Sequence, residues 1–411
     1  MKKLSPLSPF IPLVLLIALI ASWIELDLYA PSFPQMMHHF HTNEQMMQWT
    51  LSCNFLGFFV ASLLCGSLAD SFGRRKVLIA GSLLFALGSV VCLIAPDIWT
   101  LILGRLIQGI GVSAPVTVAI AVVADLYQGE RQVRILSLIS SCVTIMMAAA
   151  PVMGVFLTEA FGWRSNFIVI ALGAFISGVL IAGLIPETLE EERRRPFSVK
   201  QLFSGYFTLL RNSYFISVTI CLSCFIAAYF VFIGIIPLLF MEQLGVDLRT
   251  YGFYQGAVVG LYALLSLSVS WVIERCNVNS ALWISICIAL FFGVALLLLG
   301  IFVPDNPFWI TLLMCMYVVG LVLPGNVLFT DMMDLYPDLK GSCSSLFQSL
   351  RMLMMAFATY LAGWLYDGTF LPVGAVIAAL TFGGFVFGFA TMSARSRVRG
   401  NAVSSVGIAM H

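Results

Sequence analysis

Long apolar stretches follow one another along the chain and are separated by short polar turns. We predict twelve of them, at residues 9–30, 45–66, 76–95, 99–123, 133–158, 165–185, 213–240, 251–273, 279–302, 308–331, 342–364 and 370–392. About 20 helical residues cross a bilayer core, where a helix satisfies all of its backbone hydrogen bonds internally. The pattern predicts an all-α polytopic membrane protein with twelve transmembrane helices.

The longest polar interval divides these stretches into two sets of six. We therefore expect an N-terminal six-helix bundle at 1–185, a linker at 186–212, a C-terminal six-helix bundle at 213–392 and a tail at 393–411. The linker reads as solvated, with a short amphipathic helix at 198–210. Two such bundles predict parallel repeats that rock about a central cavity, where a substrate would bind near the membrane midplane.

Composition and charge narrow the class of protein. Hydrophobic residues make up 60% of the chain and charged residues 10%, with a net charge of +1, which excludes a soluble domain and a basic nucleic-acid binder. We expect membrane lipid, protons and a small molecule as partners, and no nucleic acid. Cys221 and Cys224 form a C-x-x-C inside an apolar stretch without a second pair, so we expect packing rather than a metal site.

Basic residues indicate how the chain is oriented. One side of the predicted membrane receives Lys2, Lys3, Arg74, Arg75, Lys76, Arg131, Arg134, Arg193, Arg194, Arg195, Lys200, Arg211, Arg275, Lys340, Arg395, Arg397 and Arg399, and the other receives Arg164 and Arg249. Cytoplasmic loops carry the excess of Lys and Arg. Both termini are therefore expected in the cytoplasm.

Two motifs resemble signatures of a known transporter family. Residues 66–76 (GSLADSFGRRK) and 101–111 (LILGRLIQGIG) closely resemble the signatures of the major facilitator superfamily between the second and third helices and in the fourth helix. The chain contains no H-E-x-x-H, G-x-S-x-G or nucleotide-binding glycine loop. We therefore expect a transporter and not an enzyme, with a proton gradient in place of a cofactor.

Nearly the whole chain looks like one group within that superfamily, the bicyclomycin-resistance-like (Bcr/CflA) twelve-helix drug:proton antiporters. The resemblance rests on residues 25–34 (ELDLYAPSFP), 149–154 (AAPVMG), 162–164 (GWR), 186–188 (PET), 334–337 (DLYP), 341–346 (GSCSSL) and Arg351. It implies the major facilitator fold in a bacterial inner membrane. We expect the protein to work as a monomer. The resemblance also implies proton-coupled export of amphipathic drugs or other small molecules by alternating access.

One departure from the family pattern bears on the direction of transport. The fifth-helix signature of antiporters usually reads Gly-Pro and then Gly-Gly, whereas this chain has Ala150-Pro151 and Gly154-Val155. Pro151 can still kink the helix and Gly154 still permits close helix approach. Export is favoured, but a dedicated exporter or importer of one polar metabolite, such as a siderophore, and a non-transporting sensor stay open as alternatives.

Ionisable residues at membrane depth are candidates for proton coupling because each costs several kcal/mol there. Asp27 and Arg105 lie roughly 5 to 9 Å from the outer ends of their spans, and we expect them to interact. Asp27 is our preferred proton carrier. The alternatives are that Asp27 and Arg105 form a static ion pair that fixes helix packing, or that Asp27 is solvated at the outer interface. Glu25 points about 200° away from Asp27 on a helix, so either Glu25 faces the cavity in its place, or Glu25 is a second acid, or the helix is broken.

Besides Asp27, which we also expect to face the substrate cavity, further residues are candidates for its wall. Arg351 is expected near mid-depth and needs an anion, which is either an acidic or zwitterionic substrate or a structural partner. Asn326, after Pro324-Gly325, is expected to line the same cavity. Tyr29 is one of several aromatic residues that could form a drug-accommodating wall or simply pack.

The turn at residues 66–76 supplies candidates for conformational gating, together with Pro151 and Gly154. The resemblance implies that Asp70, Arg74 and Asp125 form a network that locks the outward-open state against the start of the eleventh helix near Ser342. Gly66 and Gly73 belong to the same turn. A topology signal alone would explain the neighbouring basic residues but neither Asp70 nor Gly66.

Overall fold

Helices form almost all of the structure. The computed structural model describes residues 10–408 with gaps at 190, 195–196, 304 and 335–339. Its helices are α1 (Phe10–Tyr29), α2 (Phe33–His39), α3 (Glu44–Phe72), α4 (Arg74–Leu93), α5 (Ile98–Leu126), α6 (Gly129–Phe161), α7 (Arg164–Leu184), α8 (Val199–Leu210), α9 (Ser213–Pro237), α10 (Leu248–Arg275), α11 (Val278–Phe302), α12 (Pro307–Asp334), α13 (Lys340–Leu365) and α14 (Leu371–Ile408). Short 3₁₀ turns lie at Ala30–Ser32 (η1) and Glu191–Arg193 (η2), and a π-helical turn (η3) at Leu238–Gln243 extends α9.

Side-chain caps explain where several of these helices begin. Each capping residue is an Asn or Asp whose side-chain oxygen accepts a hydrogen bond from a backbone N–H two or three residues later, which satisfies one of the free donors of the first turn. These residues are Asn43, Asp97, Asn212, Asp247, Asn277 and Asn306. Polar residues in the predicted turns therefore start helices as well as marking the membrane boundary.

The number of membrane-spanning helices agrees with the sequence prediction. Eleven helical segments of the described chain are long and apolar enough to cross a membrane. The twelfth predicted span corresponds to α13, which has 26 residues. Its buried Ser345, Ser349 and Thr359 face the protein interior, which explains its lower hydropathy.

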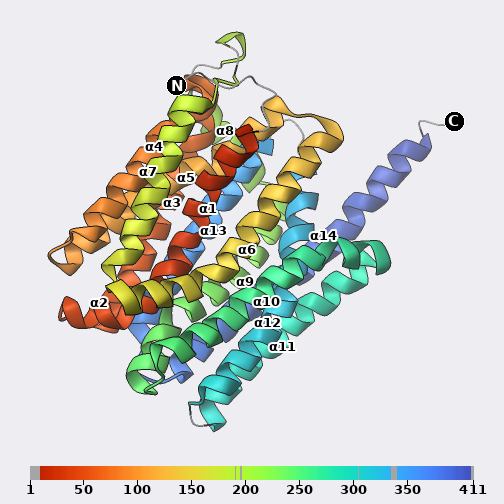
Figure 1. Ribbon diagram of the computed structural model, residues 1–411. Helices are drawn as coiled ribbons and strands as arrows, with labels where there is room; N and C mark the ends of the chain where they lie inside the picture. The colour runs from red at the N-terminus through yellow and green to blue at the C-terminus, as the bar shows by residue number, and fades with distance from the viewer. Residues whose placement is uncertain (1–9, 190, 195–196, 304, 335–339, 409–411) are drawn as a thin grey trace.

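The helices form two six-helix bundles that repeat the same packing (Figure 1). Helix α4 packs against α5 and α7 in the N-terminal bundle, and α11 packs against α12 and α14 in the C-terminal bundle. Helix α1 packs against α7, and α9 correspondingly against α14. Helix α8 lies in the linker, and α14 continues through most of the segment expected as a tail.

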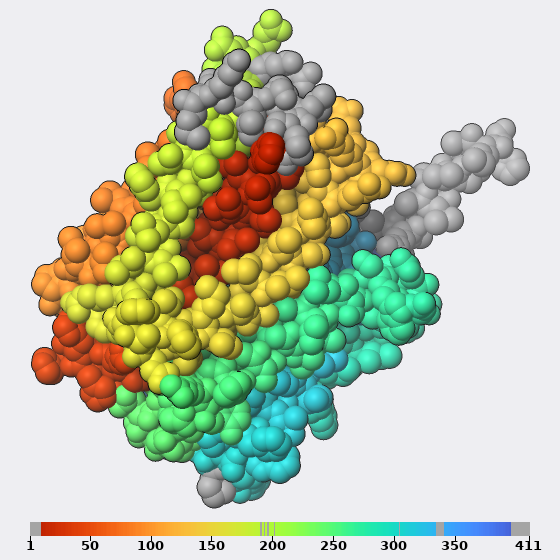
Figure 2. All heavy atoms as spheres, viewed as in Figure 1, coloured from red at the N-terminus to blue at the C-terminus, as the bar shows by residue number. Residues whose placement is uncertain are grey.

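The two ends of the molecule differ in how closely the bundles meet. We call the end that carries Arg74 and Arg75 the basic end, and the other the opposite end. At the opposite end the bundles are joined by His38–Glu242 at 3.0 Å and Arg249–Glu159 at 2.7 Å. Towards the basic end α6 and α10 diverge, and a hollow lies between them (Figures 1 and 2).

The contact between α3 and α13 holds the bundles together along that divergence. Ser62 on α3 and Ser349 on α13 share a hydrogen bond of 2.6 Å, and the Tyr206 hydroxyl of α8 donates to the carbonyl of Leu63 at 2.7 Å. The molecule is therefore closed at the opposite end and opens at the basic end on the side of α6 and α10.

Candidate functional site

A cavity of about 430 Å³ lies between the two bundles. It is lined by α1, α3, α5 and α6 on one side and by α9, α10, α12 and α13 on the other. On α5 and α6 the lining residues lie in the halves nearer the basic end, at 112–123 and 136–147. The cavity is therefore reached from the basic end, and its volume falls in the range of small-molecule sites.

Glu25 of α1 lies on the cavity wall and forms a buried ion pair with Arg105 of α5. Arg105 Nη1 lies 3.1 Å from Glu25 Oε2 and 2.7 Å from the amide oxygen of Gln108. The Arg105 side chain is fully buried and the Glu25 side chain is 2% exposed. Gln108, one helical turn after Arg105, in turn donates to Ser89 Oγ at 2.7 Å. A network of α1, α4 and α5 thus holds the carboxylate against the cavity.

Asp27 does not belong to this pair, so our expectation that Asp27 and Arg105 interact is wrong. Asp27 is also buried, but it does not line the cavity, and its Oδ1 has no hydrogen-bond partner in the described structure. Its carboxyl interacts electrostatically with the hydroxyls of Tyr229 and Tyr251, which belong to the C-terminal bundle. Of the alternatives that the sequence left open, the structure places Glu25 on the cavity and Asp27 against neighbouring helices.

Tyr29 also lies outside the cavity, which corrects its assignment to the wall. Its ring covers the Arg105 guanidinium, 4.3 Å from the centroid, and its hydroxyl lies 2.9 Å from Thr50 Oγ1. The ring packs between Phe33 and Phe167. Tyr29 therefore shields the ion pair from solvent rather than facing a ligand.

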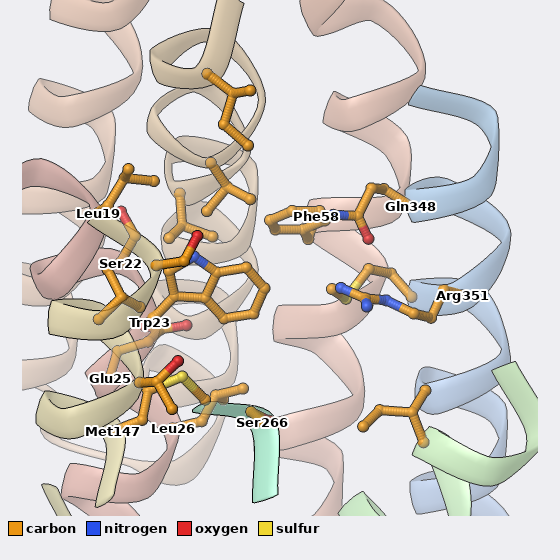
Figure 3. Close-up of a pocket in the computed structure, with 18 of the residues that line it drawn as sticks. Leu19, Ser22, Trp23, Glu25, Leu26, Phe58, Met147, Ser266, Gln348 and Arg351 are labelled. Atoms are coloured by element: carbon orange, nitrogen blue, oxygen red, sulfur yellow. The ribbon is translucent and has the colours of Figure 1, made fainter. Parts of the chain in front are cut away.

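Arg351 and Asn326 do line the cavity, on its C-terminal wall. Asn326 uses its side-chain N–H to bond the Val322 carbonyl, 2.9 Å away. Arg351 forms no hydrogen bond or ion pair with any residue that the structure describes, and its Nε is buried without a partner. Figure 3 shows Arg351 and Gln348 reaching from one wall towards Trp23 and Phe58. The described residues therefore do not support the alternative that Arg351 is a structural arginine paired with another side chain.

The predicted contacts among Asp70, Arg74 and Asp125 are present at the basic end, whereas the described residues show no bond from them to the start of α13 near Ser342, and the locking role stays a prediction. Arg74 contacts Asp70 at 2.7 Å and Asp125 at 3.3 Å. The sequence did not indicate its link to the linker, where Glu187 accepts from the Arg74 backbone N–H at 2.9 Å and the Thr188 hydroxyl donates to Asp125 at 3.1 Å. In this conformation the residues outside the N-terminal bundle that bond to this network belong to the linker.

Two of the other gating candidates are glycines at positions where a side chain would clash with or crowd a neighbour. Gly73 has φ +100°, a left-handed conformation that favours glycine, and a Cβ there would lie 2.3 Å from the Glu187 carboxylate. Gly66 packs beside Ser345 of α13, whose hydroxyl would lie 3.0 Å from a Cβ. The turn therefore touches both the linker and the C-terminal bundle.

Helices α1 and α6 come close at Gly154, within a few residues of Asp27. A Cβ on Gly154 would lie 2.0 Å from the backbone carbonyl of Leu28. Pro151 lies inside α6, one turn earlier. Further along α6, towards the opposite end, Val155 contacts Gly252 of α10. Pro151 and Gly154 therefore lie where α6 contacts both bundles.

Several residues of the site were not predicted: Asn54 and Gln348, which line the cavity, and Gln108, which bonds Arg105 behind its wall. Gln108 could have been found, because it follows Arg105 by three residues and so lies on the same helical face. Asn54 donates to the Arg105 backbone carbonyl at 3.3 Å across a helix contact, and nothing in the sequence indicates that contact.

Comparison with known proteins agrees with this architecture. Residues 15–359 match the model of the Major Facilitator Superfamily. The chain belongs to the Major Facilitator Superfamily. This confirms the predicted fold, and the family indicates a transporter rather than a catalytic enzyme.

Individual members of the superfamily are similar over most of their length. The multidrug resistance protein MdtM of Escherichia coli O157:H7 is 24% identical over 376 residues, covering 89% of this chain and 91% of MdtM. The bicyclomycin resistance protein homolog of Haemophilus influenzae is 23% identical over 330 residues, covering 79% and 82%. The fold also matches the xylose transporter XylE from E. coli in a partially occluded inward open conformation, with TM-score 0.71, 14% identity and coverage of 93% and 98%. Its apolar helices and bacterial relatives place the protein in the inner membrane as a multi-pass protein.

Proposed function

We propose that this protein is a proton-coupled antiporter that exports amphipathic small molecules by alternating access. The observation that carries the proposal is a cavity between the bundles, open at one end, with apolar walls and buried acids close by. Relatives named for multidrug and bicyclomycin resistance support export of drug-like compounds. The excess of Lys and Arg at the basic end supports a cytoplasmic position for that end and for both termini.

Asp27 is the acid that we assign to the coupling proton. A buried carboxylate without a cation or donor is costly, so Asp27 holds its proton while the opposite end is closed. Glu25 has the Arg105 guanidinium as a counter-ion and stays ionised. The two acids therefore take different roles, because only one of them has a cation to balance its charge.

Rocking of the bundles gives Asp27 access to each side of the membrane in turn. Opening the opposite end separates η1 from α9 and α10, which it contacts here, so that Asp27 loads its proton from that side. Closing that end buries the acid beside Tyr229. Because Tyr229 also lines the cavity, its hydroxyl offers the proton an exit towards the basic end. Proton entry is thereby coupled to substrate exit.

Everted membrane vesicles test this assignment. With an acidic lumen, vesicles carrying the wild type should accumulate a fluorescent amphipathic compound chosen from a panel of anionic, neutral and cationic dyes. Asp27→Asn should lose the acceleration by the gradient while retaining exchange of labelled for unlabelled compound. Glu274→Gln, an exposed acid on α10, is the matched control and should behave as wild type.

Three results would contradict the proposal. Gradient-driven uptake by Asp27→Asn at the wild-type rate would exclude Asp27 as the carrier. Loss of gradient dependence in a folded Glu25→Gln, with Asp27→Asn active, would move the proton to Glu25 and the cavity wall. If wild-type vesicles transport no compound of a broad drug panel, export of amphipathic drugs is wrong.

A further inference from the structure

The charges of the cavity wall do not balance. Among the described residues that line it, Glu25 is the one acid and Arg351 the one base. Glu25 is already bonded to Arg105, which is fully buried behind the wall. The positive charge of Arg351 is therefore left without a counter-ion at membrane depth, where an unpaired arginine is costly.

Arg351 is oriented to bind a ligand rather than to join helices. Its guanidinium extends from α13 into the space between the walls, towards Trp23 of α1 (Figure 3). Gln348, one turn before it, extends the same way and its Oε1 has no hydrogen-bond partner in the described chain. The guanidinium offers several N–H donors to one group of oxygens, and the Gln348 side-chain N–H₂ can add to them, while its unpaired Oε1 is an acceptor.

An apolar surface lies next to these donors. Trp23 and Phe58 stand on the facing helices, and Phe230 and Met352 line the same space. Aromatic rings and flexible methionine side chains accept varied apolar shapes. The cavity thus presents a cationic, donor-rich group and an aromatic wall within one volume of about 430 Å³.

We propose that the cavity takes amphipathic monoanions, whose carboxylate or sulfonate group binds Arg351 and Gln348 while an aromatic body packs against Trp23 and Phe58. This inference rests on the proposed transport function and names its substrate class. A monoanion would neutralise Arg351 and leave the Glu25–Arg105 pair undisturbed, so the loaded cavity wall would carry no net charge.

The anion site is also linked to the proposed proton site. Arg351 interacts electrostatically with the hydroxyl of Tyr262, and the ring of Tyr262 lies 5.8 Å from that of Tyr229. Tyr229 in turn interacts with Asp27. The two tyrosines thus connect the substrate charge on α13 with the acid on α1, across the interface at which the bundles must separate.

A matched pair of probes tests the substrate class without a proton gradient. 8-Anilinonaphthalene-1-sulfonate (ANS) and N-phenyl-1-naphthylamine share an aromatic skeleton and differ in the anionic group. Binding of each to the protein in nanodiscs is measured by isothermal titration calorimetry, with empty nanodiscs titrated as the blank. The wild type should prefer ANS over the neutral compound by roughly 10- to 100-fold, as expected for hydrogen bonds to a charged group.

Variants assign that preference to Arg351. Arg351→Gln should abolish the preference and leave affinity for N-phenyl-1-naphthylamine within about twofold, since the apolar wall is intact. Arg351→Lys keeps the charge without the planar fork and should retain part of the preference. Arg211→Gln, whose guanidinium lies over Phe207 outside the cavity, is the control and should leave the preference unchanged. A monodisperse elution profile and wild-type melting temperature show that each variant is folded.

Three results would overturn the assignment. The first is that the wild type binds the two probes with equal affinity, and the second is that it does not bind ANS. The third is that folded Arg351→Gln loses affinity for both probes to the same extent. Because binding needs no gradient, an ANS preference in a protein that shows no proton-driven transport would leave the anion site standing and refute antiport. Antiport of neutral or cationic drugs alone, without ANS binding, would support antiport and refute the anion site.

Discussion

Glu25→Gln and Asp27→Asn should have very unequal consequences for stability, although the two acids are two residues apart. Glu25→Gln removes the only carboxylate bonded to Arg105 in the described chain, and Arg105 is fully buried. Breaking a buried pair by removing one partner costs about 3–5 kcal/mol, because the remaining charge is uncompensated. Asp27→Asn removes a carboxyl that has no cation beside it and replaces it with a group of similar shape, so we expect a change below about 1 kcal/mol.

Thermal unfolding of purified protein in detergent measures this difference. At about 2–4 °C per kcal/mol for a unit the size of one bundle, Glu25→Gln should lower the melting temperature by roughly 6–20 °C. A thiol-reactive dye provides the signal, since all ten cysteines are free and most are buried or half-buried. Asp27→Asn should melt within about 3 °C of the wild type on the same scale.

A second substitution tests the cause. In Glu25→Gln/Arg105→Met no buried charge remains, and replacement of a buried pair by apolar residues is often neutral or stabilising. The double variant should therefore recover most of the lost stability. If Glu25→Gln melts like the wild type, or Asp27→Asn melts as early as Glu25→Gln, the assignment of charges in α1 and α5 is wrong.

Three other substitutions probe the moving parts. Gly154→Ala places a methyl group against the Leu28 carbonyl and should cost about 1–3 kcal/mol and slow transport; a normal melting temperature and rate would contradict the close contact of α1 and α6. Gly73→Ala strains a left-handed turn by about 1–2 kcal/mol, and reduced drug uptake in vesicles should follow, whereas unchanged uptake would show that the turn is not needed for gating. In a cysteine-free background, His38→Cys/Glu242→Cys should form a disulfide that stops transport until it is reduced; transport by the oxidised form would show that the opposite end need not open.

The sequence alone determined the fold, because the bilayer leaves the backbone few solutions. Apolar runs of about 20 residues must be helices there, and the polar turns that separate them must lie at the surface, so length and composition predict the spans. The contacts among Asp70, Arg74 and Asp125 were also expected, from the resemblance to the family; Asp70 lies near the end of α3, Arg74 begins α4 and Asp125 lies near the end of α5, all at the basic end.

The tertiary structure alone decided which buried charges meet. Glu25 and Asp27 have similar depth and chemistry, and depth was the only coordinate that the sequence supplied for pairing either with Arg105. The rotation of α1 about its own axis, fixed by packing against α6 at Gly154 and against α7, turns Glu25 towards Arg105 and Asp27 towards α9 and α10. Likewise, Arg351 was expected at mid-depth, but only the packed cavity, with its other charges already paired, leaves that guanidinium free to receive a ligand.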